Sequence, residues 1–247
     1  THALFQDKVV FHKLALAIID EQHRFGVHQR MALQHKGAYP HQLVMTATPI
    51  PRTLTMTLYA DMDVSVIDEL PKGRQPITTH TAAQPKRPEL IERLRKILAQ
   101  GQQAYWVCTL IERSEEIEAL SAEEAFDLLR RNLPESRVAL LHGRMKGDEK
   151  VEVMRAFKAG EYQLLVATTV VEVGVDVPNA TQMFIENAER LGLAQLHQLR
   201  GRVGRGSKAS RCFLLFKPGV SQAGQHRLNA LRPVSYTHLT LPTIVSV

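Results

Sequence analysis

The feature that most constrains the fold is a regular alternation, between residues 77 and 216, of short apolar runs with amphipathic segments. The apolar runs are typical of β-strands, and the segments between them carry hydrophobic side chains at the spacing of an α-helix. Such alternation indicates βαβ units, which place parallel strands in one sheet. The sequence therefore predicts an α/β protein with strands at 77–81, 103–109, 138–141, 163–167, 182–185 and 211–216.

The segments between these strands predict helices with recognisable ends. A helix opened by Pro88 should bury one apolar face, because proline suits the first turn of a helix. Ser121 begins a capping-box pattern, so we expect a helix from that residue to about residue 132. Asp148 is expected to cap a helix that turns Val151 inward, and a last helix is predicted over 191–199.

A shorter alternation precedes residue 70. The apolar runs 14–19 and 42–45 are typical of buried parallel strands, and 64–67 is a third candidate. Residues 71–76 carry two prolines and a glycine without a hydrophobic period, which is typical of a linker. We therefore expect one domain over 1–70 and a second over 77–232.

The composition limits the classes of partner and compartment. The 247 residues carry a net charge of +6, which favours a polyanionic partner. No apolar run approaches the roughly 20 residues of a membrane span, so no membrane contact is expected. Cys108 and Cys212 lie in apolar runs, which predicts buried thiols of a reducing cytosol rather than a disulfide. No cluster of histidine and cysteine has zinc-ligand spacing.

Two polar groups follow the first two predicted strands. Asp20 and Glu21 end the first, an arrangement in which one acid holds Mg²⁺ through water and the other activates an attacking water. A solvated acid pair is the alternative, and His23 alone suggests only a local hydrogen bond. Thr46 and Thr48 follow the second strand, where their hydroxyls can bond to the acids, although a simple turn explains them equally well.

Further polar residues follow two later strands. His142, Gly143 and Arg144 come directly after the run 138–141, and Thr168 follows 163–167. Hydroxyl, imidazole, guanidinium and backbone N–H groups are the donors that contact phosphate oxygens. Because the carboxyl ends of parallel strands share an edge where ligands bind, we expect all the polar motifs to gather there.

The last group contains the densest run of arginine and glycine, residues 198–206. Arg202 and Arg205 are three positions apart, so on a helical turn both would face one direction, as two forks for phosphate oxygens. A basic patch on a solvated surface is the alternative. Gly174 permits a tight turn just upstream, and Asp176 is suited to accept a hydrogen bond from a ribose hydroxyl.

Residues 20–27, 46–53, 166–177 and 198–206 together resemble motifs II, III, V and VI of superfamily 2 helicases. Asp-Glu-Gln-His-Arg-Phe-Gly-Val at 20–27 and Ala-Tyr-Trp-Val-Cys at 104–108 are similar to the RecG family of bacterial ATP-dependent DNA helicases. Transcription-repair coupling translocases share the pattern at 46–53, but their second motif usually reads Asp-Glu-Glu-His. The resemblance covers roughly residues 1–232.

The resemblance implies two RecA-like lobes, one partial and one nearly complete, with ATP and Mg²⁺ in the cleft between them. It implies a monomer of the bacterial cytoplasm that acts on branched or forked DNA at stalled replication forks. It also implies roles for single residues: Asp20 for Mg²⁺ through water; Glu21 for the hydrolytic water; His23, Thr46 and Thr48 for coupling; Gly174, Asp176 and Gln198 for nucleotide; Arg202 and Arg205 for the γ-phosphate; and His142, Gly143, Arg144 and Thr168 for DNA.

The sequence departs from the family in two places. No glycine is followed by lysine, so the Gly-Lys-Ser/Thr phosphate loop is missing and we expect no activity from this chain alone. Residues 233–247 leave the family pattern, and 234–243 look like a translated sequencing adapter, so we expect no evolved role there. Two other readings stay open: a nucleic-acid-binding module without catalysis, and strand-end residues that only form turns.

Overall fold

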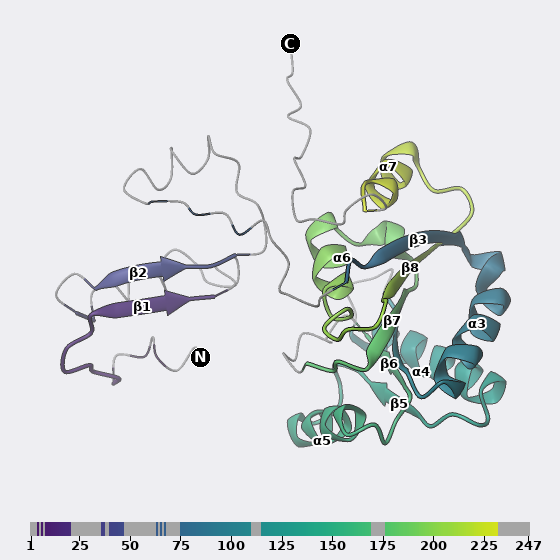
Figure 1. The fold of residues 1–247 in the computed structure, drawn as a ribbon, viewed down its shortest axis with the longest axis horizontal. Coiled ribbons are helices and arrows are strands. Elements are labelled where there is room, and N and C mark those ends of the chain that lie inside the picture. Colours follow the sequence, from purple (N-terminus) through teal and green to yellow (C-terminus); the bar gives the residue numbers. More distant parts are fainter. Residues whose placement is uncertain are drawn as a thin grey trace, which may run out of the picture. The chain divides into compact units, whose positions relative to one another are not determined.

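The computed structural model describes residues 4, 6, 8–20, 36–37, 40–46, 63, 65, 67, 75–109, 115–168 and 176–231. The chain divides into two compact units at residue 66, and each is described by itself (Figure 1). Half of the candidate strand at 64–67, most of the linker 71–76 and the tail 233–247 lie outside the described residues. The predicted domain limits therefore stay predictions.

The first unit contains two short parallel strands. β1 (Leu16–Ile19) pairs with β2 (His41–Val44) in the register that places Ile19 opposite Val44. Ala17 and Ile19 are buried, whereas Leu16 and Ile18 are more than half exposed. The predicted strands exist, but the expectation that they are buried on both faces is wrong for this chain, because only one face of β1 is covered.

The second unit is built on a six-stranded sheet in which every pair of neighbouring strands is parallel (Figure 1). The spatial order of the strands is β3-β8-β7-β4-β6-β5. Their bounds are β3 Thr78–Ala83, β4 Gln103–Val107, β5 Val138–Leu141, β6 Leu164–Ala167, β7 Ala180–Ile185 and β8 Arg211–Phe216. The predicted α/β class with a parallel sheet is confirmed.

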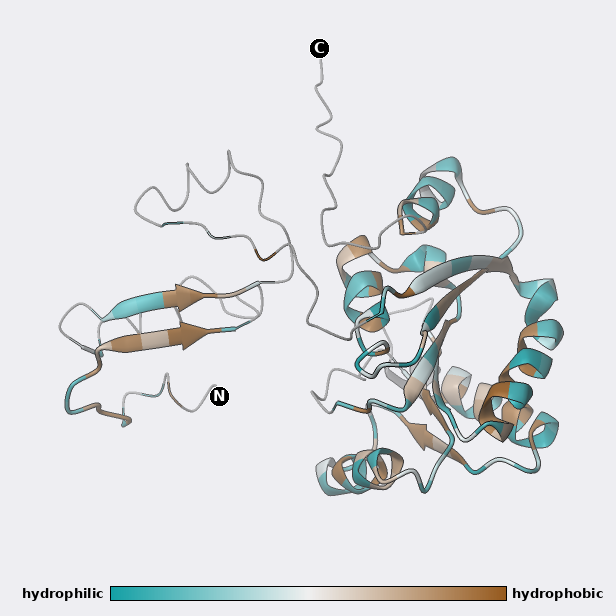
Figure 2. Ribbon diagram, in the orientation of Figure 1, coloured by the Kyte–Doolittle hydropathy of each residue, from teal (hydrophilic) through white to brown (hydrophobic). Residues whose placement is uncertain are grey.

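Helices cover both faces of this sheet. α3 (Arg87–Ala99) and α4 (Glu115–Asn132) contribute to one apolar cluster, with α3 burying Leu90, Ile91 and Leu94. α5 (Gly147–Lys158), α6 (Leu193–Arg200) and α7 (Gln222–Ala230) contribute to the cluster on the other face. Two short 3₁₀ helices, η3 (Gln84–Lys86) and η4 (Ala188–Arg190), follow β3 and β7. Figure 2 shows that, apart from β3, the strands of this sheet are mostly apolar and that the helices beside them carry polar residues on their outer faces.

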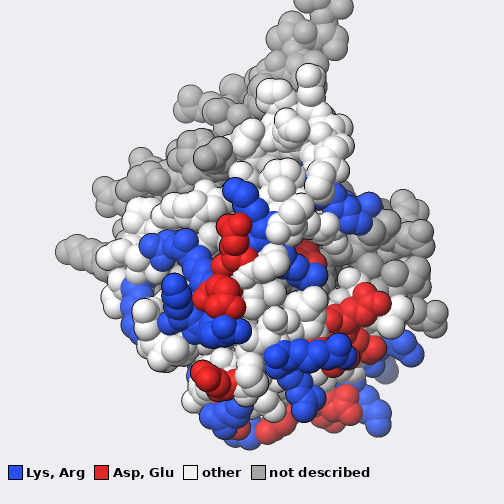
Figure 3. All heavy atoms as spheres, turned by 90° about the vertical axis from the view of Figure 1, so that its right-hand side faces the viewer, with Lys and Arg blue, Asp and Glu red and all other residues white. Residues whose placement is uncertain are grey.

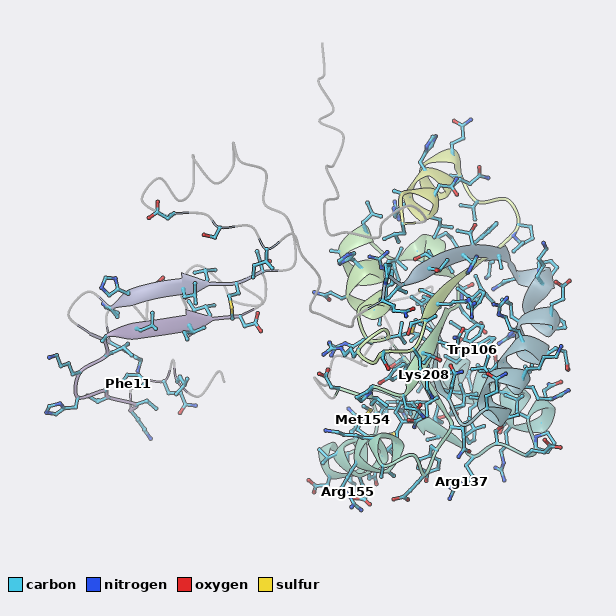
Figure 4. All side chains as sticks on the ribbon, viewed as in Figure 1. Phe11, Trp106, Arg137, Met154, Arg155 and Lys208 are labelled. Atoms are coloured by element: carbon cyan, nitrogen blue, oxygen red, sulfur yellow. The ribbon has the colours of Figure 1, made fainter. Side chains whose placement is uncertain are left out.

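A stack of rings crosses the sheet under α3. Trp106 of β4 stacks on Phe184 of β7 at 4.8 Å between ring centroids, and Phe184 stacks on Phe213 of β8 at 4.9 Å. His80 of β3 extends the stack at 5.2 Å from Phe213. Figure 4 shows Trp106 inside the unit, between the sheet and α3. Because these large side chains come from four strands, they fix the packing of the strands on this face.

The structure corrects three details of the predicted helices. α4 begins at Glu115, so Ser121 lies inside the helix rather than at its start. The N-cap of α5 is Lys146, whose backbone N–H donates to the Glu149 carboxylate at 3.1 Å, so Asp148 is not the cap. Val151 is 62% exposed, because the inner face of α5 is formed by Met154, Ala156 and Phe157.

The prediction for the two cysteines is confirmed, whereas one helix was not predicted. Cys108 and Cys212 are buried free thiols, as predicted. Sequence patterns did not identify α7, whose start is capped by the Ser221 hydroxyl, which accepts from the Gly224 N–H at 3.2 Å. On the face in Figure 3, basic and acidic side chains are interspersed. That face is therefore no uniform polyanion-binding surface.

Candidate functional site

The first candidate group lies where β5 and β6 end. These strands are neighbours, and Leu141, the last residue of β5, is paired with Ala167, the last of β6. His142 and Thr168 therefore follow side by side, and the Thr168 N–H donates to the Leu141 carbonyl at 3.1 Å. The structure thus brings together the residues that the sequence suggested for phosphate contact.

Two polar side-chain atoms in this group are buried without a hydrogen-bond partner among the described residues: His142 Nδ1 and Thr168 Oγ1. Thr168 is fully buried, and the His142 side chain is 14% exposed, with its Nε2 3.9 Å from a Glu123 carboxylate oxygen. An unpaired buried polar atom costs about 1–3 kcal/mol, so such atoms call for an explanation. A ligand with oxygen atoms is one explanation, because both groups can donate a hydrogen bond.

Two cationic side chains lie close to these strand ends. Arg144 is exposed directly after His142 and Gly143. Lys150, from the first turns of α5, donates to the Gly143 carbonyl at 2.5 Å and so fixes the loop between β5 and α5. Sequence reasoning missed Lys150, although its position shortly after the His-Gly-Arg run was a usable signal. The group can attract an anion and offers donors at short range.

The second candidate group lies at the amino ends of the strands, on the opposite side of the sheet from the carboxyl ends that hold the first group. Gly204, with φ of 76°, lies against Ile77, which directly precedes β3. A Cβ at Gly206 would lie 2.5 Å from the carbonyl of Pro178, which precedes β7. The arginine-glycine run therefore packs against the amino ends of the strands, and glycine is required at both contacts.

This placement corrects the expectation that every polar motif gathers at the carboxyl ends. Asp176 comes shortly before β7 and lies with the arginine run at the amino ends, whereas His142 and Thr168 lie at the carboxyl ends. The physical reason is the path of the chain. α6 returns along the sheet after β7, so its last turn reaches the edge where the strands begin.

Arg205 and Asp176 form an ion pair in this second group. Arg205 Nε also donates to the Gly201 carbonyl at 3.2 Å. Gln198 and Arg202 are half-buried nearby in sequence, in α6 and the turn that follows it. Two residues predicted to contact different parts of a nucleotide are thus in direct contact with each other.

The charges of Arg202 and Arg205 influence the pKa of Tyr105, a buried residue of β4. Burial raises the pKa of its hydroxyl to about 12, and the positive charges of Arg202 and Arg205 oppose that rise. Tyr105 belongs to the apolar cluster on the sheet face that α5, α6 and α7 cover, so the arginine run influences a residue of that core. Tyr105 is neutral at ordinary pH and adds no negative charge to compete with a phosphate.

In the first unit, the structure places Asp20 and Thr46 at the same end of the two-stranded sheet. Asp20 directly follows β1, Thr46 follows β2, and the Met45 N–H donates to the Ile19 carbonyl at 2.8 Å. Both residues are exposed. Glu21, His23, Thr48 and Gly174 lie outside the described residues, so their predicted roles stay predictions.

The fit to a metal ion can be judged from Asp20 and Thr46. Over the described part of the chain, no three histidine, cysteine or acidic side chains form a metal-binding group. An exposed carboxylate beside a hydroxyl suits Mg²⁺ held through water, since Mg²⁺ usually keeps several of its waters. Asp20 with Thr46 therefore fits an outer contact to Mg²⁺ but not a complete set of ligands.

Among the described helices, none is long and apolar enough to cross a bilayer.

Comparison with known proteins gives related sequences over almost the whole chain. The model of the helicase conserved C-terminal domain matches residues 89–207. The ATP-dependent DNA helicase RecG of Escherichia coli O157:H7 is 63% identical, over 94% of this chain and 34% of that protein. RecG of Bacillus subtilis is 50% identical over the same shares. The chain thus spans about a third of the length of these relatives.

Solved structures agree with the sequence relatives. RecG bound to a three-way DNA junction matches with a TM-score of 0.72 and 45% identity, over 93% of this chain and 29% of that chain. A point variant of S. cerevisiae Dbp5 bound to RNA and ADP BeF3 matches with a TM-score of 0.59 at 14% identity, over 92% of this chain and 61% of that chain. The second match, at low identity, shows a shared fold only.

Proposed function

We propose that this chain belongs to the RecG family of DNA helicases and supplies part of an ATP-driven motor that moves on branched DNA. Its share is most of the second RecA-like lobe and a piece of the first. In this proposal the whole protein remodels stalled replication forks and branched recombination intermediates. It acts as a monomer in the bacterial cytoplasm.

The observation that carries the DNA-binding part is the pair of buried unpaired atoms, His142 Nδ1 and Thr168 Oγ1, at adjacent strand ends. Arg144 lies next to them, and Lys150 holds the loop through Gly143. We assign these side chains and the backbone of Gly143 to phosphates of the DNA strand. Such contacts position the motor on DNA without reading its sequence.

The nucleotide part rests on the second group. In our proposal, Arg202 and Arg205 face the γ-phosphate of ATP, with Gln198, Gly174 and Asp176 close to the nucleotide. Asp20 holds Mg²⁺ through water, Glu21 activates the hydrolytic water, and His23, Thr46 and Thr48 couple the two events. ATP with Mg²⁺ supplies the free energy for movement; the residues of this chain position the phosphates and the water.

A second candidate function applies to this chain on its own. No glycine in the sequence is followed by lysine, so the chain has no phosphate loop to hold ATP. The DNA-contacting group at β5 and β6 does not depend on that loop. By itself, the chain should therefore act as a nucleic-acid-binding module that does not hydrolyse ATP.

The test is a chimera in which residues 1–231 replace the matching third of the 62% identical RecG of Escherichia coli K12. We expect ATP hydrolysis that branched DNA stimulates. Glu21→Gln should abolish hydrolysis but spare nucleotide binding, and Arg205→Ala should slow turnover by on the order of a thousandfold. Normal rates in both variants would show that the catalytic assignments are wrong.

A further inference from the structure

Arg200 is the last residue of α6 and differs from the other two arginines in its run. Its side chain is buried, with the residue only 7% exposed, whereas Arg202 is half-buried and Arg205 is exposed. Arginine is seldom buried, because removing a guanidinium from water is costly. The burial of Arg200 indicates a role that Arg202 and Arg205 do not share. The sequence motifs suggested roles for Arg202 and Arg205 but none for Arg200.

The Arg200 guanidinium is held by a neighbour on its own helix. Its Nη2 lies 3.3 Å from Nε2 of His197, one turn earlier in α6. Since arginine can only donate, the His197 nitrogen accepts and the ring is neutral. Burial lowers the pKa of the Arg200 guanidinium, and the Cys212 thiol of β8 partly opposes that lowering. The carboxyl end of α6 adds partial negative charge there.

The turn that carries the other two arginines starts from this anchored residue. The Arg200 carbonyl accepts from the Val203 N–H at 3.3 Å, and the Leu199 carbonyl accepts from the Arg202 N–H at 3.0 Å. Val203 is fully buried. The Gly201 carbonyl accepts from Arg205 Nε at 3.2 Å. A shift of Arg200 would therefore move the backbone from which Arg202 and Arg205 extend.

We infer that Arg200 is a positioning residue, a buried cation that fixes the turn after α6 so that Arg202 and Arg205 both face the nucleotide phosphates. The part of this inference that concerns nucleotide phosphates rests on the proposed function. The part that concerns the fixing of the turn by Arg200 does not. A buried hydrophobic side chain of similar length would fill the same space with a smaller desolvation penalty. Only the guanidinium supplies several donors in a fixed plane, which lysine cannot reproduce.

The first experiment measures anchoring in the 247-residue chain without any activity. Amide hydrogen exchange of residues 201–206 is compared among the unsubstituted chain, Arg200→Lys, Arg200→Met and Arg202→Ala. We expect several-fold faster exchange in both Arg200 variants and no change in Arg202→Ala. Equal exchange in the unsubstituted chain and both Arg200 variants would overturn the inference.

The second experiment separates positioning from general stability in the chimera. Arg200→Lys should lower kcat about tenfold or more with little change in KM for ATP, because misplacing a catalytic group by about 1 Å costs on the order of a hundredfold. Leu196→Ala is the matched control, since it removes a fully buried side chain from the same helix. It should lower Tm at least as much as Arg200→Lys while leaving kcat close to that of the unsubstituted chimera.

The two ideas fail in different ways. An unsubstituted chimera without DNA-dependent hydrolysis would overturn the proposed function, and the exchange experiment would still decide whether Arg200 anchors the turn. An active chimera in which Arg200→Lys keeps a normal kcat would overturn the positioning role. A loss of kcat in Leu196→Ala equal to that in Arg200→Lys would also overturn it, because the effect would then follow stability alone.

Discussion

Arg205 forms an ion pair with Asp176, which is 29 positions earlier in the chain and shortly before β7. The pair joins the arginine run to the segment that leads into the centre of the sheet. Both side chains are partly exposed, at 34% for Arg205 and 57% for Asp176. Water therefore screens the attraction, and the pair contributes to position more than to stability.

The first prediction follows from that exposure. Asp176→Asn should change the free energy of unfolding of the chain by less than about 1 kcal/mol, as is usual for exposed ion pairs. Urea unfolding of Asp176→Asn, Arg205→Gln and the double variant gives the coupling between the two side chains. A coupling above about 2 kcal/mol would contradict the prediction and would mean that the pair is a structural clamp.

Thr168→Val should move stability and DNA affinity in opposite directions. The Thr168 hydroxyl is fully buried and has no partner among the described residues, so an apolar group of the same shape should be neutral or stabilising to the fold. If the hydroxyl contacts a phosphate, the affinity for DNA should fall. Thermal unfolding and fluorescence anisotropy with labelled DNA measure the two effects; Thr181→Val, whose hydroxyl is already bonded to Gln102, is the control for β-branched replacement.

Much of the second unit could be predicted because its central strands β4, β6 and β7 are buried on both faces and read as largely apolar runs. The start of α4 could not be predicted from Ser121, because the buried stripe of Ala119, Ala122 and Ala125 continues on both sides of it. A capping pattern inside a helix does not differ in sequence from one at its end. Packing decides which is used.

The sequence indicated candidate site residues, whose roles stay predictions, but it did not indicate their arrangement. His142 and Thr168 follow strands that turned out to be neighbours, which strand ends alone do not reveal. The arginine run lies at the amino ends because α6 returns along the sheet after β7, and the motif taken by itself does not indicate this. Arg200 was overlooked because a buried arginine and an exposed one look alike in a basic run.

His197 predicts how stability depends on pH. Burial and then the charge of Arg200 lower its pKa from 6.5 in the folded chain. The unfolded chain therefore binds a proton more readily, so the stability associated with neutral His197 is complete above pH 6.5 and is lost as the pH falls through the folded pKa. His197→Asn removes this effect. The difference in free energy of unfolding between the chain and His197→Asn should shrink or reverse from pH 7 to pH 5; a constant difference would contradict the prediction.

Glu186 links three elements, and its loss should be costly. Its carboxylate accepts from the Trp106 indole N–H at 2.7 Å and pairs with Arg87 at the start of α3. Glu186→Ala should destabilise the chain by about 3 kcal/mol, because Arg87 and the indole lose their partner in a largely buried place. Glu186→Gln should cost less, since the amide oxygen can still accept from the indole. Trp106 is the single tryptophan of the chain, so its fluorescence follows both unfolding transitions.

The chain on its own should bind DNA but show no DNA-stimulated ATP hydrolysis above background. Binding needs only the charges and donors around His142, Thr168 and Lys150, and it should weaken steeply with salt because phosphate contacts release counterions. Hydrolysis needs a phosphate loop, which the sequence does not contain. Phosphate release and DNA anisotropy, measured on one preparation at low and high salt, test both halves. Clear turnover would mean that a nucleotide site is complete without the loop, whereas salt-independent DNA binding would remove the case for phosphate contacts at β5 and β6.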